Sequence, residues 1–350
     1  MAEYTHGGDV LTARSRYGGA VLDFSTNLNP LGIPDQAAQA AAQADGSAYP
    51  DALCRQLRQA IAAHDGVEAE QVICGNGAAD LIFRLAFALR PQKALLLAPT
   101  FSEYEEAVSA AGCGVVRHVL DPERDFDLTE AVLDDLEPGL DLAFFCTPNN
   151  PTGRVIRREL MEAILEKCRA AGIRLVVDEC FLALSDGGEE ASLAGYLEQY
   201  PNLLLLRAFT KSYAMPGLRL GYCLSADTAL LDRLSRCAQP WSVSGPAQAA
   251  GLAAAAEPLH PLLARQLIAP ERSWLTQAME GLGLRVFPSA ANYLLFRAPG
   301  VSDLKERLLG RGVLIRSCAN YPGLGEDYYR VAVRLRGENE RLIQAMKEVL

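Results

Sequence analysis

The sequence lacks several features that define whole classes of protein. Its four histidines are far apart, and its nine cysteines include no Cys-x-x-Cys pair. We therefore expect free thiols in a reducing compartment and no metal site. No apolar run approaches the length of a membrane span, and residues 1–9 do not resemble a signal peptide, so we expect a cytoplasmic protein. Acidic residues outnumber basic ones, 43 to 33, which argues against nucleic-acid and membrane-surface partners.

What is present is an ordinary globular composition, with 50% hydrophobic residues in a chain of 350. In the middle of the chain, short apolar runs alternate with segments of helical period. We expect strands at 93–98, 141–146, 173–177, 202–206 and 218–224, and helices at 78–89 and 158–171. This alternation predicts an α/β fold with a mostly parallel sheet, whose ligands gather at the carboxyl ends of the strands.

The pattern changes in the last third of the chain, which predicts a second domain. We expect a large ligand-binding domain over 46–255 and a small α+β domain over 256–350. Residues 1–45 are expected to form an amino-terminal segment that belongs to the small domain and to an active-site loop.

Lys211 is the most informative residue in the chain. It directly follows the apolar run 203–206 and precedes a Gly/Pro turn and Arg219. An amine beside a buried strand can form a Schiff base with an aldehyde, and pyridoxal 5'-phosphate (PLP) is the aldehyde that proteins use to stabilise carbanions. For a lysine taken alone, a solvated strand cap is the competing interpretation.

Three further motifs suit such a cofactor. The turn Cys74-Gly-Asn-Gly-Ala-Ala-Asp80 precedes a helical pattern, so its backbone could bind a phosphate, and Arg219 could bind the same group or a surface acid. Asp178 ends a buried strand and could keep a pyridine nitrogen protonated, although a helix cap or a metal ligand is an alternative. Asn150, in Thr147-Pro-Asn-Asn-Pro-Thr-Gly153, could donate to the ring oxygen or simply form a turn.

In this order the motifs resemble the fold-type I PLP-dependent enzymes, and among them the histidinol-phosphate aminotransferase branch. The resemblance implies an aspartate aminotransferase-like fold, PLP as the cofactor, Lys211 as the Schiff-base lysine and Asp178 as the partner of the pyridinium. It also implies the remaining contacts: Gly77, Ala78, Thr210 and Arg219 to the cofactor phosphate, Phe101 to the face of its ring, Asn150 to the ring oxygen and the substrate, and Arg330 to the substrate carboxylate. Such enzymes are typically homodimers, and Tyr49 resembles a residue lent to the neighbour's cofactor phosphate.

Two features resemble one group within this branch, the L-threonine-O-3-phosphate decarboxylases of cobalamin biosynthesis. The first is His6-Gly-Gly-Asp9 with the segment 23–32, which implies that His6, Gly7 and Asn27 contact the substrate. For His6 alone, a disordered tail is the alternative. The second is Phe181, where the aminotransferases generally carry tyrosine.

The implied activity is decarboxylation of O-phospho-L-threonine to (R)-1-amino-2-propanol O-2-phosphate. Arg316 suits the phosphate of this small substrate, because a guanidinium binds phosphate at two points. It would equally suit histidinol phosphate, so a histidinol-phosphate aminotransferase is the alternative. A non-catalytic ligand-binding paralogue is a further alternative, against which the intact Lys211, Asp178 and Arg219 argue.

Two positions depart from the pattern. Ala208 stands where relatives often have a hydroxyl on the cofactor phosphate, so one contact worth about 1 kcal/mol is expected to be missing. Cys180 replaces a small alanine beneath the ring, and we expect it to act as a compact buried hydrophobe.

Overall fold

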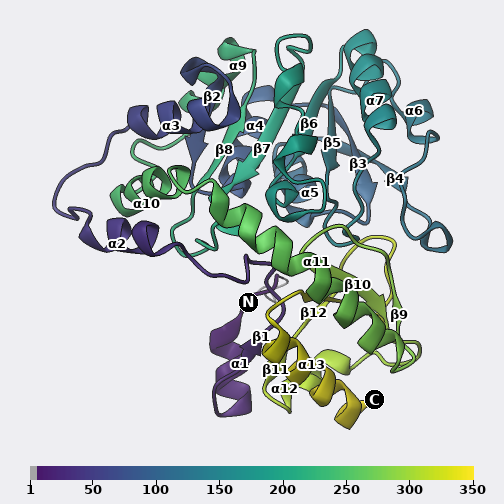
Figure 1. Cartoon of the computed structure of the whole chain (residues 1–350). Helices are drawn as coiled ribbons and strands as arrows, with labels where there is room; N and C mark the ends of the chain where they lie inside the picture. The colour runs from purple at the N-terminus through teal and green to yellow at the C-terminus, as the bar shows by residue number, and fades with distance from the viewer. Residues whose placement is uncertain (1–5) are drawn as a thin grey trace.

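The computed structural model describes residues 6–350, and its larger sheet has seven strands (Figure 1). Across the sheet they are β2 (Val72–Gly75), β8 (Gly221–Leu224), β7 (Leu203–Ala208), β6 (Arg174–Asp178), β5 (Leu142–Cys146), β3 (Lys93–Ala98) and β4 (Gly114–Val119). Strand β8 is antiparallel to both of its neighbours, and the other pairs are parallel. The expected α/β fold with a mostly parallel sheet is confirmed.

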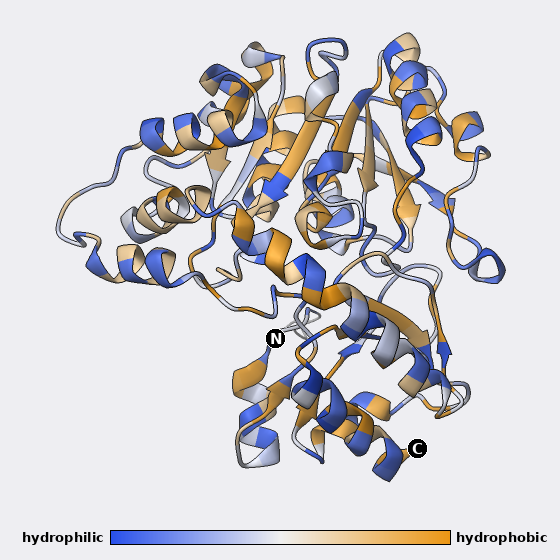
Figure 2. Ribbon diagram, viewed as in Figure 1, coloured by the Kyte–Doolittle hydropathy of each residue, from blue (hydrophilic) through white to orange (hydrophobic). Residues whose placement is uncertain are grey.

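Helices cover both faces of this sheet, because successive side chains of a strand point to opposite sides. In β6, Leu175 and Val177 belong to one hydrophobic cluster and Val176 to another. The first cluster includes side chains of α3 (Arg55–Asp65), α7 (Arg158–Ala171) and α10 (Gly245–Ala255), and the second those of α4 (Ala78–Leu89), α5 (Ser102–Ala110) and α9 (Thr228–Arg236). The central strands are accordingly almost wholly hydrophobic (Figure 2).

The smaller part of the molecule is built on an antiparallel sheet, β12 (Arg316–Ser317), β13 (Tyr328–Ala332), β10 (Tyr293–Arg297) and β9 (Arg285–Val286). Beside it β1 (Leu22–Asp23) pairs in parallel with β11 (Val313–Leu314), and Phe24 packs into the same core. The amino-terminal segment thus joins the carboxyl-terminal part of the chain.

The remaining elements connect or flank the two parts. They are α1 (Val10–Tyr17), α2 (Asp35–Gln43), α6 (Val132–Asp135), α8 (Phe209–Ser212), α11 (Leu259–Glu280), α12 (Leu304–Leu309), α13 (Arg336–Val349) and five 3-10 turns at Ala69–Gln71, Pro122–Arg124, Leu182–Leu184, Glu189–Ala191 and Ala194–Tyr196. Helix α11 extends from the large part to the small one (Figure 1). Among residues 6–350, no helix has the length and apolar character that spanning a membrane requires.

Some expected boundaries differ from those observed. The run 218–224 forms a strand only from Gly221, because Arg219 has a left-handed backbone (φ 56°) and turns the chain first. Strands β2 and β4 were not expected; β4 is an edge strand, largely half-buried or exposed, so its apolar pattern is weak. The division at residues 45 and 255 stays a prediction.

Candidate active site

A cavity of about 490 Å³ lies where the carboxyl ends of β5, β6 and β7 meet the smaller part of the molecule. Twelve of the expected site residues line it: His6, Gly7, Asn27, Ala78, Phe101, Asn150, Asp178, Thr210, Lys211, Arg219, Arg316 and Arg330. Gly77 lies directly before Ala78, at the start of α4. Tyr49 is the expected site residue that the structure places elsewhere.

Lys211 lies on the short helix α8, directly beyond β7. Its Nζ atom lies 5.6 Å from the centre of the Phe181 ring. Burial, with the nearby Arg330 guanidinium, lowers the pKa of Lys211 to about 8. About a tenth of the amine is therefore unprotonated at pH 7, far more than for a lysine of ordinary pKa, and this form is the nucleophile for an aldehyde.

Asp178 ends β6 and is buried at the floor of the cavity. Its Oδ2 accepts a hydrogen bond from the Tyr104 hydroxyl at 2.6 Å, and its Oδ1 accepts one from the Cys180 amide at 2.9 Å. Burial raises the pKa of Asp178, so a cation in the cavity would stabilise its charged form. This environment fits a protonated pyridine nitrogen.

The residues at the start of α4 form a cradle that a side chain would fill. Gly77 has φ 82°, and a Cβ atom there would lie 2.7 Å from Nη2 of Arg219. A Cβ at Gly221 would lie 2.5 Å from the amide nitrogen of Ala78. Both glycines therefore leave the helix terminus open beside a guanidinium, and Thr210 adds a hydroxyl at the cavity wall. This arrangement fits a phosphate.

Two arginines come from the antiparallel sheet of the smaller part of the molecule. Arg330 is buried: one nitrogen bonds Asn150 Oδ1, Nη2 donates to the Ser25 carbonyl at 2.9 Å, and within the described residues Nε has no partner. Arg316 donates to Asn320 Oδ1 at 2.8 Å, and its guanidinium lies 5.5 Å from the centre of the Tyr321 ring. The cavity thus offers two cationic groups besides Arg219, which suits a ligand with two anionic ends.

The amino-terminal segment closes one side of the cavity. Gly7 packs so tightly that a Cβ would lie 2.3 Å from the Ser25 carbonyl oxygen, and the Gly8 amide donates to Ser25 Oγ at 2.8 Å. His6 Nε2 lies 3.0 Å from Glu103 Oε1. The structure thus places His6 in the lining of the cavity. Asn27, also on the wall, has an Oδ1 without a partner within the described residues.

The sequence did not indicate Tyr104 or Glu103, although each lines the cavity, whereas Tyr321 lies in the segment 320–323 that follows Arg316 and suits the same phosphate site. Tyr104 follows Phe101 at helical spacing, and the two rings meet edge to face at 5.5 Å. That spacing was the available signal for Tyr104, whereas the position of Glu103 depends on tertiary contacts.

Tyr49 lies outside this cavity. It is 80% exposed, and its ring stacks on that of Trp241 with centroids 4.3 Å apart.

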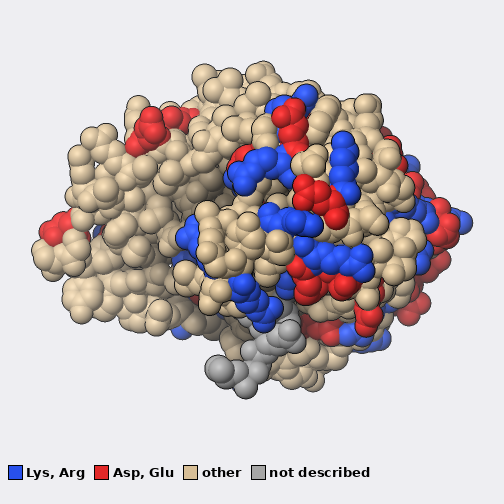
Figure 3. Space-filling model, turned by 90° about the horizontal axis from the view of Figure 1, so that it is seen from below, with Lys and Arg blue, Asp and Glu red and all other residues tan. Residues whose placement is uncertain are grey.

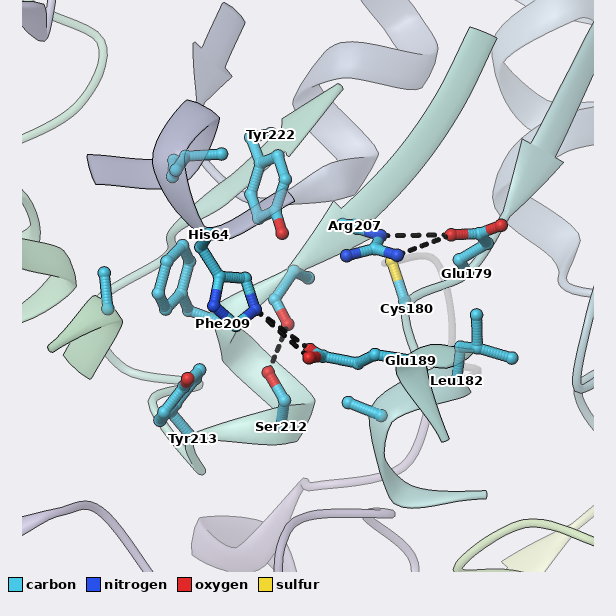
Figure 4. A pocket seen from close by; sticks show the side chains of 14 residues that line it. His64, Glu179, Cys180, Leu182, Glu189, Arg207, Phe209, Ser212, Tyr213 and Tyr222 are labelled. Atoms are coloured by element: carbon cyan, nitrogen blue, oxygen red, sulfur yellow. Dashed lines mark hydrogen bonds and ion pairs between the residues drawn. The ribbon is translucent and has the colours of Figure 1, made fainter. Parts of the chain in front are cut away.

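A second, small cavity adjoins the first and shares Cys180 and Ala208 with it (Figure 4). It holds a buried ion cluster: Arg207 pairs with Glu179 at 3.0 Å and with Asp65 at 2.6 Å. These contacts join the ends of β6, β7 and α3. They therefore help to fix the position of Asp178, at the end of β6, relative to Lys211, just beyond β7. Burial raises the pKa of the Cys180 thiol well above its usual value, in keeping with a compact hydrophobe.

Residues 20–346 match the family described as "Aminotransferase class I and II", and the chain belongs to that family. Within it, the chain is 40% identical over 352 residues to the threonine-phosphate decarboxylase of Salmonella typhimurium, covering 99% of this chain and 96% of the relative. It is 34% identical over 355 residues to the histidinol-phosphate aminotransferase of Nitratidesulfovibrio vulgaris strain Hildenborough, covering 99% of this chain and 94% of that one.

Solved structures agree with this assignment. The histidinol-phosphate aminotransferase from Clostridium acetobutylicum superposes with a TM-score of 0.86 at 27% identity, covering 94% of this chain and 99% of that one. The L-threonine-O-3-phosphate decarboxylase from Porphyromonas gingivalis has a TM-score of 0.83 at 25% identity, covering 93% and 98%. The aspartate aminotransferase of Thermus thermophilus bound to maleate shares the fold, with a TM-score of 0.83 at 23% identity over both whole chains. The expected aspartate aminotransferase-like fold and family are confirmed.

Proposed function

We propose that this protein is a PLP-dependent decarboxylase of O-phospho-L-threonine, the activity in cobalamin biosynthesis that the sequence resemblance implies. The observation that carries the proposal is that one cavity holds the Lys211 amine, the Asp178 carboxylate and two guanidinium groups, Arg316 and Arg330. A phosphorylated amino acid has the two anionic ends that these arginines match. The 40% identity to a threonine-phosphate decarboxylase supports the same substrate class.

The residues that would hold PLP divide by its chemical groups. The glycine cradle with Arg219 and Thr210 would bind the phosphate, Asp178 would bind the ring nitrogen, Phe101 would cover the ring and Asn150 would contact the ring oxygen. Lys211 would be the covalent anchor. When bound, PLP supplies an electron-poor ring that takes up the electron pair released when a bond to Cα breaks.

The residues that bind the carboxylate and the phosphate of the substrate would determine which bond to Cα breaks. Arg330 would bind the carboxylate, while Arg316, His6 and Asn27 would bind the phosphate, so binding energy far from Cα orients the reacting bond. The bond between Cα and the carboxylate carbon breaks, and carbon dioxide leaves. Cα then takes up one proton, and the protonated Lys211 amine, which lines the cavity, would donate it. The product is (R)-1-amino-2-propanol O-2-phosphate.

A histidinol-phosphate aminotransferase is the second candidate, and the 34% identity to such an enzyme favours it. Phe181 distinguishes the two, because it presents no hydroxyl to the cavity and instead packs edge to face on Tyr293 with ring centroids 5.0 Å apart. Loss of one hydrogen bond to the ring oxygen shifts the acid–base balance at the cofactor. This difference favours the decarboxylase.

The test uses purified protein loaded with PLP. With O-phospho-L-threonine we expect one carbon dioxide for each amino-alcohol phosphate formed, and no such release from Lys211→Ala. Transfer of an amino group from histidinol phosphate to 2-oxoglutarate, without carbon dioxide, would instead establish the aminotransferase. Binding of O-phospho-L-threonine without turnover of either substrate would indicate the non-catalytic paralogue.

We also propose a homodimer in which Tyr49 reaches the neighbour's cofactor phosphate. Tyr49, Leu53 and Trp241 are exposed, although large apolar side chains are usually covered. Seen from below, the left-hand end of the molecule shows few charged side chains, while they gather on the right (Figure 3). That end carries α2, α10 and the connection between α2 and α3 (Figure 1). If Trp241→Glu sediments as a monomer while the wild type sediments as a dimer, the result would support this surface as the dimer interface.

A further inference from the structure

Glu103 is an acid at the end of the cavity assigned to the substrate phosphate. It is the second residue of α5, its side chain is 16% exposed, and its Oε1 lies 3.0 Å from His6 Nε2. Both side chains line the cavity together with Arg316. A carboxylate beside a phosphate site is unfavourable by itself, so its presence there needs a physical reason.

We propose that Glu103 is a positioning and specificity-determining residue that holds His6 as an imidazolium facing the phosphate of the substrate, beside Arg316. This inference rests on the proposed function, because it assigns the phosphate of the substrate to that end of the cavity. It gives His6 a defined charge and orientation, which a histidine alone lacks near neutral pH.

The charges around His6 support this arrangement. The pKa of His6 is raised, chiefly because its Nε2–H donates a hydrogen bond to Glu103; the charge of Glu106 on the same helix also raises it, while burial and Arg316 lower it. The protonated pair is neutral overall, whereas neutral His6 would leave the Glu103 charge facing a phosphate. Binding should therefore weaken as pH rises through the pKa of His6.

The backbone fixes where His6 can reach. The Gly7 contact with the Ser25 carbonyl excludes any side chain, and the Gly8 amide bonds Ser25 Oγ at 2.8 Å. The same Ser25 carbonyl accepts from Arg330 at 2.9 Å. Through Ser25, the segment that carries His6 is thus tied to the arginine assigned to the carboxylate. Ser25 therefore links the two ends of the cavity, and Arg316 and Arg330 are themselves register partners on β12 and β13.

The experiment compares the PLP-loaded wild type with Glu103→Gln. For O-phospho-L-threonine we expect KM to rise roughly tenfold, the loss of one charge-assisted contact, with kcat within about twofold. The alkaline limb of kcat/KM should move to lower pH, because His6 loses its partner. In a His6→Gln background, Glu103→Gln should raise KM no further.

Glu105→Gln is the matched control. It removes the same charge from the same helix, but Glu105 pairs with Arg117 and does not line the cavity. This variant should leave KM and the alkaline limb of the kcat/KM profile unchanged. An unchanged KM in Glu103→Gln, or a fall in kcat alone, would overturn the proposal.

A second readout does not depend on turnover. The chain has four histidines, so NMR of 13C-labelled imidazoles can follow His6, assigned with His6→Gln. Its titration should move to lower pH in Glu103→Gln, and inorganic phosphate should move it to higher pH in the wild type. If the wild type releases no carbon dioxide but both shifts occur, the proposed function fails and the pairing stands. If neither shift occurs, the pairing fails.

A further experiment tests a cation site formed by His6, Glu103 and Glu106. If treatment of the wild type with EDTA raises KM, these residues hold a cation, and the proposal is overturned.

Discussion

The buried Arg207–Glu179 pair offers the most demanding test of how the seven-stranded sheet supports the site. Glu179 Oε2 accepts from Arg207 Nε at 3.0 Å and from the Ser192 hydroxyl at 2.8 Å, and Oε1 accepts from the Leu193 amide at 2.8 Å. The side chains of Glu179 and Arg207 are 0% and 8% exposed. Removing one partner of such a pair costs about 3–5 kcal/mol, because the other charge is left uncompensated. Since Asp65 still contacts Arg207, we expect Glu179→Ala to lower the free energy of unfolding by about 3 kcal/mol.

Urea unfolding followed by circular dichroism measures this change. The matched control is Glu166→Ala, which breaks an exposed pair with Arg169 whose side chains are 54% and 49% exposed. Its cost should stay below about 1 kcal/mol. If the two variants lose similar free energy, the buried cluster does not hold the strand ends. Because Glu179 follows Asp178 directly, Glu179→Ala should also weaken PLP binding, which absorbance titration would detect.

Three further predictions concern the cavity itself. Because the pKa of Lys211 is lowered to about 8, the rate of PLP incorporation into cofactor-free protein should rise with pH, with its midpoint near 8, and then level off. Stopped-flow absorbance measures this rate, and a midpoint in the usual lysine range would contradict the lowered pKa. Asp178→Asn should reduce kcat at least roughly a hundredfold, because the ring nitrogen loses its anionic partner; carbon dioxide release measures it, and near-normal turnover would exclude that role. Tyr104→Phe removes the 2.6 Å hydrogen bond to Asp178 and should weaken PLP binding roughly tenfold. The control is Tyr196→Phe, which removes an exposed hydrogen bond to Glu162 and should leave PLP binding unchanged.

Much of the site could be predicted because its main groups sit at strand ends. Lys211 and Asp178 each follow or end a buried apolar run, and parallel strands bring such ends to one edge of the sheet. The signal for β4 was weak because an edge strand is only half-buried. Glu103 carried no local signal, since a carboxylate on a helix is usually solvated.

By itself, the sequence determined the family and the α/β class and pointed to Lys211 as the candidate Schiff-base lysine, because these depend on local patterns and short motifs. Tertiary structure decided which distant segments meet: Arg330 bonds Asn150, 180 positions away, and Ser25, 305 positions away. It also placed His6 against Glu103 and left Tyr49 on the outer surface. Contacts of this kind arise from the packing of two cores against each other, which hydrophobic periodicity within either one does not encode.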